Sequence, residues 1–146
     1  MRKMTVDQRF PIALVIGSAG AAVALAIQAT TGTFSGEAGF VRVAGAGALL
    51  GGLALADGFG RPGWAGLIRS VLSFAGATVF GAMMAVVLLP LDQFLSDIDP
   101  FGPLRDAVSA AVVGPLFVLG SILEEAAVLA VWSVGAGAAH LLRRTL

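Results

Sequence analysis

The stretch between Pro11 and Thr31 decides the fold class of this chain. It is PIALVIGSAGAAVALAIQATT, and it contains no charged residue. A helix rises about 1.5 Å per residue, so about 20 apolar residues span the roughly 30 Å hydrocarbon core of a bilayer. The apolar core of a cleavable signal peptide is shorter, at about 7 to 15 residues. The stretch is therefore predicted to be a retained first membrane span.

The composition of the whole chain indicates the same class of protein. Of its 146 residues, 58% are hydrophobic and 12% are charged, and the mean hydropathy is +0.93. A soluble domain has about 25% charged residues. The nine basic and nine acidic residues cancel, so the chain has no positive field for nucleic acid. The absence of cysteine excludes disulfides, thiolate metal sites and thiol catalysis.

Three further apolar stretches follow the first. They cover approximately residues 39–56, 66–91 and 115–142. Together with residues 11–31, they predict an all-α integral membrane bundle of four transmembrane helices, in a single membrane domain over residues 1–146. The lipid bilayer is the expected partner, and neither a nucleic acid nor a cofactor is expected.

The last apolar stretch is longer than one crossing requires. Between residues 107 and 142 the only charged residues are Glu124 and Glu125. As one straight helix this segment would extend about 54 Å, although about 30 Å is enough to cross the hydrocarbon core. The chain therefore has to bend, break or lie partly along the membrane surface here.

Three interpretations of this stretch remain open. In the first, residues 121–142 cross once, and residues 104–119 form an interfacial or oblique helix. In the second, one long helix is kinked at Pro115, which lacks a backbone donor. In the third, two crossings are separated at Gly120 and Ser121, where a capping-box pattern begins. The bundle would then have five spans.

The distribution of basic residues favours four crossings. With the N-terminus in the cytoplasm, four spans place seven basic residues on the cytoplasmic side and two on the outer side. The seven are Arg2, Lys3, Arg9, Arg61, Arg69, Arg143 and Arg144, and the two are Arg42 and Arg105. Cytoplasmic loops are enriched in lysine and arginine, and a fifth crossing would move the C-terminal arginines outside. We therefore expect a multi-pass inner-membrane protein with both termini in the cytoplasm.

Small residues recur every four positions in the second and third spans. In the second span they are Ala44, Ala48 and Gly52, together with the pair Gly47 and Gly51, and in the third they are Ser73, Ala77, Gly81 and Ala85. Residues four apart share a helix face, and small side chains let two backbones approach closely. We expect these rows to pair the second and third spans. The alternative is that one such face contacts a second copy of the chain or another membrane subunit.

Glu124, Glu125 and Arg42 are the charged residues that cannot be assigned simply to loops or span ends. If the last helix is centred on the glutamates, they lie near mid-membrane, where a carboxylate is costly and usually functional. If Leu142 marks the inner boundary, they lie at the outer rim or in the first turn of a helix, where acids are favoured. Arg42 is expected at a similar level. An ion pair between Arg42 and a glutamate would be either a structural link or part of an ion site.

The sequence contains no motif that indicates catalysis or metal binding. His140 is the only histidine, and its place near the basic C-terminus is typical of an interfacial residue. Glu124 and Glu125 match the first two positions of the EExxxR motif of intramembrane prenyl-protein proteases. Leu129, however, occupies the arginine position of that motif. We expect no enzymatic activity.

Two functions are compatible with these features. The small-residue faces, the short loops and the missing catalytic motif favour an accessory or scaffolding subunit of a membrane assembly. The alternative is a small transporter or channel subunit in which Arg42, Glu124 and Glu125 form a polar site. The four-span layout, the chain length and the stretch from Gly36 to Leu55 resemble the small membrane subunits of tripartite solute transporters. That resemblance implies a role in transport.

Overall fold

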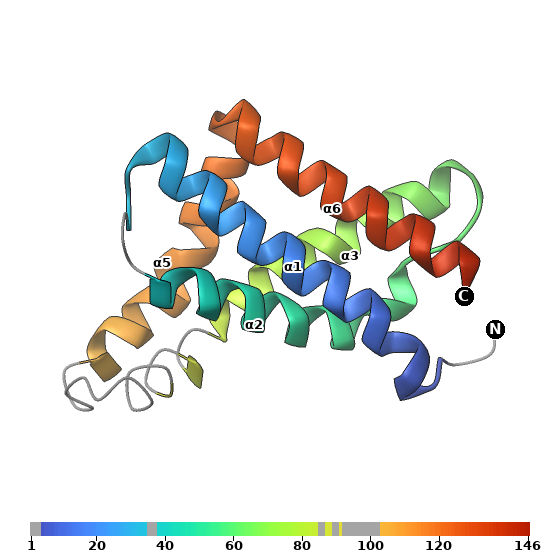
Figure 1. The fold of residues 1–146 in the computed structure, drawn as a ribbon, viewed down its shortest axis with the longest axis horizontal. Coiled ribbons are helices and arrows are strands. Elements are labelled where there is room, and N and C mark those ends of the chain that lie inside the picture. The colour runs from blue at the N-terminus through green and yellow to red at the C-terminus, as the bar shows by residue number, and fades with distance from the viewer. Residues whose placement is uncertain (1–3, 35–37, 85–86, 89–90, 92–102) are drawn as a thin grey trace.

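The computed structural model describes residues 4–34, 38–84, 87–88, 91 and 103–146. Every secondary-structure element in these residues is helical (Figure 1). The elements are α1 (Val6–Thr31), α2 (Ala38–Leu55), the 3₁₀ turn η1 (Ala56–Gly58), α3 (Gly63–Met83), α5 (Pro103–Glu124) and α6 (Ala126–Thr145). The predicted all-α fold class is confirmed for this part of the chain.

Four helices are long and apolar enough to cross a membrane. They are α1, α3, α6 and the segment Gly39–Gly58, which covers most of α2 and all of η1. The apolar part of α5, Ala111–Glu124, is shorter. Within the described residues, α3 ends at Met83 and Val87, Leu88 and Leu91 are again helical, so the end of the span expected over residues 66–91 lies partly outside the described residues. The described chain is thus a helical bundle with the composition of a membrane protein.

Both termini lie at the same end of the bundle. Figure 1 shows α1, α2, α3 and α6 running lengthwise, whereas α5 crosses the opposite end obliquely. α1 packs against α2 and α6, α2 packs also against α3, and α5 packs against α3 and α6. Four lengthwise helices return the chain to the end at which it began. α5 corresponds in position to the interfacial or oblique helix expected over residues 104–119.

The chain breaks between α5 and α6 at Glu125. The backbone of this residue is extended, with φ of −104° and ψ of 109°. α5 continues through Pro115 and also through Gly120 and Ser121. The structure therefore has neither one long kinked helix nor a break at Gly120.

An apolar cluster explains why the break lies where it does. Ile122, near the end of α5, and Val128, near the start of α6, are both buried in a cluster with Val23 and Ile27 of α1. A straight helix through Glu125 would carry one of these two side chains away from α1. The change of direction lets both helices cover the end of α1, and dispersion contacts of this kind hold helices together where lipid surrounds them.

α2 lies between α1 and α3, and the row Ala44, Ala48 and Gly52 faces α1. A Cβ added to Gly20 of α1 would lie 3.0 Å from the carbonyl oxygen of Ala44 and would overlap the Ala48 side chain. A Cβ added to Gly52 would lie 2.9 Å from the Cα of Ala13. The backbones of α1 and α2 therefore approach closely along this row.

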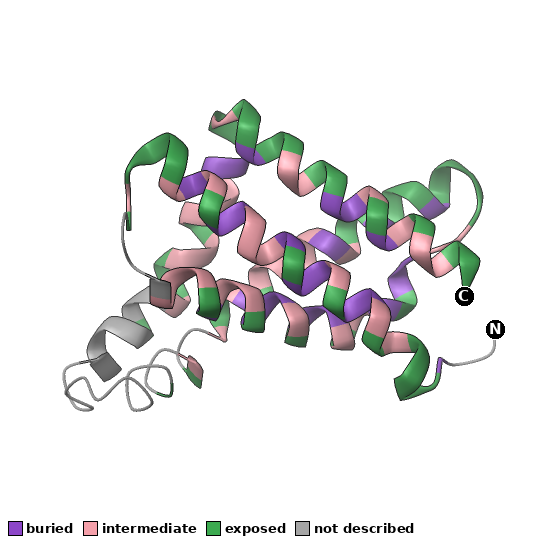
Figure 2. Ribbon diagram, in the orientation of Figure 1, coloured by how far each residue is buried: buried purple, intermediate pink, exposed green. Residues whose placement is uncertain are grey.

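The pair Gly47 and Gly51 faces α3. A Cβ added to Gly51 would lie 2.6 Å from the carbonyl oxygen of Ala77, and one added to Gly47 would overlap the backbone of Gly81. The two small-residue faces of α2 thus contact two different helices, whereas the sequence analysis assigned both to the contact with the third span. Figure 2 shows buried residues along these meeting faces and exposed residues on the outer sides.

The two remaining members of the α3 row lie elsewhere. Ser73 is half-buried next to η1, where a Cβ on Gly58 would overlap its side chain. Ala85 lies outside the described residues. Only Ala77 and Gly81 of the α3 row are therefore placed at the α2 contact by the described part of the chain.

Candidate functional site

Glu124 and Glu125 form the junction between α5 and α6. Glu124 is the last residue of α5 and is exposed, and Glu125 precedes the first residue of α6 and is half-buried. The N–H of Glu125 donates to the carbonyl of Ser121 at 2.9 Å, and the carbonyl of Glu125 accepts from the N–H of Leu129 at 2.9 Å. Acidic side chains at the start of a helix are stabilised by its dipole. Glu125 therefore lies where the dipole of α6 favours an acid, whereas Glu124 is at the end of α5, where a helix dipole disfavours one.

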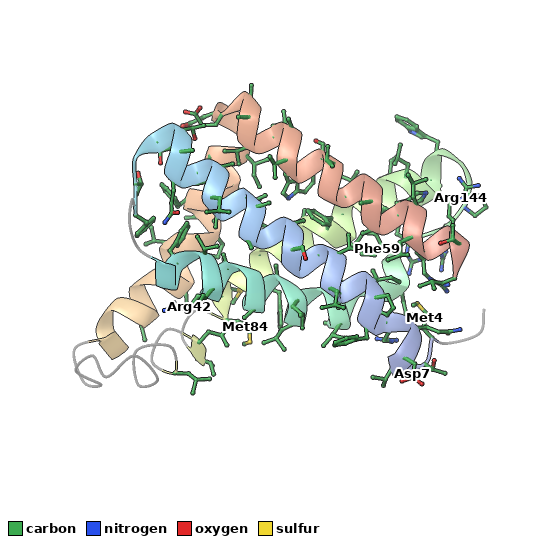
Figure 3. All side chains as sticks on the ribbon, viewed as in Figure 1. Met4, Asp7, Arg42, Phe59, Met84 and Arg144 are labelled. Carbon is green, nitrogen blue, oxygen red and sulfur yellow. The ribbon has the colours of Figure 1, made fainter. Side chains whose placement is uncertain are left out.

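Arg42 lies in the first turns of α2 and is exposed. Figure 3 labels it near the beginning of this helix, and the end of α1 lies between it and the α5–α6 junction in that view. The structure therefore does not bring Arg42 together with Glu124 and Glu125. An ion or substrate site built from these three residues stays a prediction of the sequence.

Replacing Glu124 and Glu125 together with glutamine is expected to change the free energy of unfolding by about 1 kcal/mol or less. The reason is that the favourable interaction of Glu125 with the start of α6 and the unfavourable one of Glu124 with the end of α5 are each about that size and oppose one another. The measurement is unfolding in mixed micelles by titration with dodecyl sulfate. Ion flux into liposomes that contain the protein is expected to be the same for both forms. A flux that is present in the natural protein and lost in the double variant would contradict the structural role.

A cluster of polar groups lies at the other end of the bundle, where α3 begins and α6 ends. The Ser70 hydroxyl donates to the carbonyl of Gly66 at 3.0 Å, and its oxygen lies 2.6 Å from Nδ1 of His140. The backbone N–H of Gly60, in the loop between η1 and α3, also points to Nδ1, at 3.4 Å. We call Ser70, His140 and Gly60 the polar brace. It joins α3, α6 and the loop before α3.

Gly60 is required at its position for two reasons. Its φ is 78°, a conformation that residues with a side chain rarely adopt. A Cβ at this position would also lie 2.9 Å from the Cβ of Arg143. The loop therefore packs directly against the last turns of α6.

The polar brace contains the residue types of a serine nucleophile and its base. In hydrolases an imidazole takes the proton of the serine hydroxyl, which must be open to the substrate. Ser70 is only 2% exposed, and its hydroxyl is bonded to the backbone of its own helix. This burial favours the use of the hydroxyl to link helices. Among the described residues, no group of three His, Cys, Asp or Glu side chains is placed to hold a metal ion.

A second polar link joins α3 to α6 nearer the middle of the bundle. The indole N–H of Trp132 donates to Oγ1 of Thr78 at 3.1 Å, and this hydroxyl donates to the carbonyl of Phe74 at 2.9 Å. The rings of Phe74 and Trp132 meet edge to face, with their centroids 5.1 Å apart. Aromatic pairs of this geometry are favourable beyond the area that they bury.

An ion pair between Arg9 and Asp57 ties the start of α1 to η1. Arg9 also donates to the carbonyl of Leu53 at 3.2 Å. This pair and the two α3–α6 links were all missed by the sequence analysis. Each joins residues that are between 48 and 70 positions apart, and no local pattern indicates such pairings. The one available signal was that Ser70 and His140 both fall at predicted cytoplasmic span ends.

Comparison with protein-family models, with curated proteins and with solved structures finds no match to this chain.

Proposed function

We propose that this chain is a non-catalytic multi-pass protein of the inner membrane that serves as an accessory or scaffolding subunit of a larger membrane assembly. The observation that carries this proposal is the burial of Ser70 and its bond to His140. This pairing resembles a catalytic dyad by its residue types, but it lies between helices, where it links α3 to α6. The Thr78–Trp132 bond serves the same purpose.

We propose the orientation with both termini in the cytoplasm. Its support is that the start of α1 and the end of α6 lie at one end of the bundle, where Figure 3 labels Arg144. The contacts of Gly60 with Arg143 and of Ser70 with His140 place Arg61, Arg69 and Arg143 at the same end. Basic residues are enriched on the cytoplasmic side of membrane proteins.

α6 is the helix that we propose as the contact for another subunit. Only 22% of its apolar stretch is buried within the chain, compared with 44% for α1. Its exposed residues include the small side chains Ala130, Ser133 and Ala138, and nothing lies within 4 Å of a Cβ added to Gly137. Small residues on an uncovered helix face let a second helix approach closely.

Replacing Gly137 with leucine is expected to dissociate the assembly, because the larger side chain would separate the two helix backbones. The expected result is that the natural protein, solubilised in mild detergent, migrates on a native gel as a species larger than its monomer. The Gly137→Leu variant is then expected to migrate as the monomer.

Gly120→Leu on α5 is the matched control, because a Cβ there also meets nothing within 4 Å. It is expected to leave the larger species intact. A natural protein that migrates strictly as a monomer would contradict the accessory role. A larger species that survives Gly137→Leu would contradict the contact through α6.

A further inference from the structure

Four arginines lie at the end of the bundle where α3 begins and α6 ends. Arg61 follows Gly60 in the chain, and Gly60 packs against the Cβ of Arg143. The bond between Ser70 and His140 adds two more, because Arg69 precedes Ser70 and Arg144 follows His140 by one helical turn. We call Arg61, Arg69, Arg143 and Arg144 the arginine cluster. Figure 3 labels Arg144 at this end of the molecule.

Within the described part of the chain, no ion pair joins an acidic side chain to Arg69, Arg143 or Arg144. The acidic residues described at this end are Asp7 and Asp57, and Asp57 is paired with Arg9. Asp7 lies in the first turn of α1, which Figure 3 shows well separated from Arg144. Arg69, Arg143 and Arg144 therefore keep their positive charge after the internal ion pair is taken into account.

Exposed aromatic side chains indicate the level at which this end of the bundle would lie in a membrane. Trp64, in the first turn of α3, is 75% exposed, and Phe10, in the second turn of α1, is 50% exposed. Aromatic residues at the ends of membrane helices are common at the level of the lipid headgroups. The arginine cluster is on the same side of the bundle as both rings, so it lies where lipid phosphates would be.

We propose that the arginine cluster binds the headgroup of an anionic phospholipid. A guanidinium group presents two parallel N–H donors that match the oxygens of a phosphate, and arginine is weakly hydrated for a cation. Basic residues gathered between membrane helices recognise anionic headgroups in this way. The polar brace positions the cluster, because it holds the loop, α3 and α6 together. The inference depends on the proposed insertion into a bilayer and not on the accessory role.

The experiment uses the full chain in nanodiscs of phosphatidylcholine with or without phosphatidylglycerol. Lipids retained by the protein are counted by native mass spectrometry after release from the disc.

The variant combines Arg69→Gln with Arg144→Gln, because both side chains are exposed and their loss leaves no buried group unpaired. We expect its retention of phosphatidylglycerol to fall by about tenfold, whereas phosphatidylcholine is retained equally. Arg42→Gln, an exposed arginine at the other end of α2, is the control and is expected to retain phosphatidylglycerol as the natural protein does.

The proposal would be overturned if the double variant retained as much phosphatidylglycerol as the natural protein. It would also be overturned if Arg42→Gln lost as much phosphatidylglycerol as the double variant. Inorganic phosphate added to phosphatidylcholine discs separates the two sources of a phosphate group. If inorganic phosphate raises the melting temperature of the protein as much as phosphatidylglycerol does, the ligand is a soluble phosphate and the lipid assignment is wrong. If the double variant does not fold, the retention of phosphatidylglycerol by the natural protein is compared at low and high salt. The proposal requires less retention at high salt, because salt screens the attraction between the arginines and the headgroup. Failure to enter nanodiscs at all would instead contradict the proposed membrane insertion.

Discussion

Leucine in place of Gly47 is expected to lower the free energy of unfolding by about 3 kcal/mol, at the upper end of the range for overpacked sites. Gly47 lies directly against the backbone of Gly81, and the carbonyl carbon of Gly81 is 2.9 Å from the position of an added Cβ. A backbone cannot rotate away as a flexible side chain can. The side chain would therefore force α2 and α3 apart along the whole contact that includes Gly51 and Ala77.

The measurement is unfolding in mixed micelles by titration with dodecyl sulfate, followed by the fluorescence of the two tryptophans. Gly120→Leu on α5 is the matched control, because it adds the same side chain at a helical glycine where nothing lies within 4 Å. We expect its stability to change by about 0.5 kcal/mol or less. Equal losses in the two variants would show that the close approach of α2 and α3 is not the cause.

Alanine in place of Phe74 is expected to cost about 3 kcal/mol, because it leaves a cavity between three helices. Phe74 is 2% exposed and belongs to the main apolar cluster with Ile16 and Ala136. Its ring contacts Trp132 edge to face and lies 3.0 Å from a Cβ built on Gly135. Removing the ring takes away contacts with α6 that lipid chains cannot restore inside the bundle.

Phe80→Ala on the same helix is the control for this loss. Phe80 is 38% exposed, so lipid or detergent can fill the space that its ring leaves. We expect it to cost about 1 kcal/mol or less in the same titration. A loss for Phe80→Ala as large as that for Phe74→Ala would mean that ring size, and not the contact with α6, determines the stability.

Much of the fold could be predicted from hydropathy. The span expected over residues 11–31 lies within α1, and the span expected over residues 39–56 overlaps α2. Apolar runs of this length coincide with helices because a helix satisfies the hydrogen bonds of its own backbone, as an apolar environment requires. α1 begins earlier than predicted, at Val6, because Thr5 and Gln8 satisfy its first turn, with the Thr5 N–H 3.4 Å from Oε1 of Gln8.

The candidate site could be predicted only in part. The sequence drew attention to Glu124 and Glu125 because carboxylates are rare in apolar helices, and the structure places them at a helix junction. For Ser70 and His140 the sequence indicated only that both fall at predicted cytoplasmic span ends, and it gave no indication that Trp132 bonds to Thr78. Serine, threonine and tryptophan are tolerated in membrane helices without a specific partner, so their presence alone does not mark a contact.

The sequence by itself determined the all-helical class of this protein, its long apolar helices and the arginines near the ends of those helices. These properties depend on composition and on the length of apolar runs. Each residue contributes to both independently of its neighbours in space. Only the tertiary structure decided that Gly47 and Gly51 face α3 while Ala48 and Gly52 face α1. It also decided that the chain turns at Glu125. Both depend on which helix faces can approach each other most closely. Lipid tails are as apolar as the helix surfaces, so hydrophobicity does not select the contacting faces in a bilayer, and the fit between helix surfaces does.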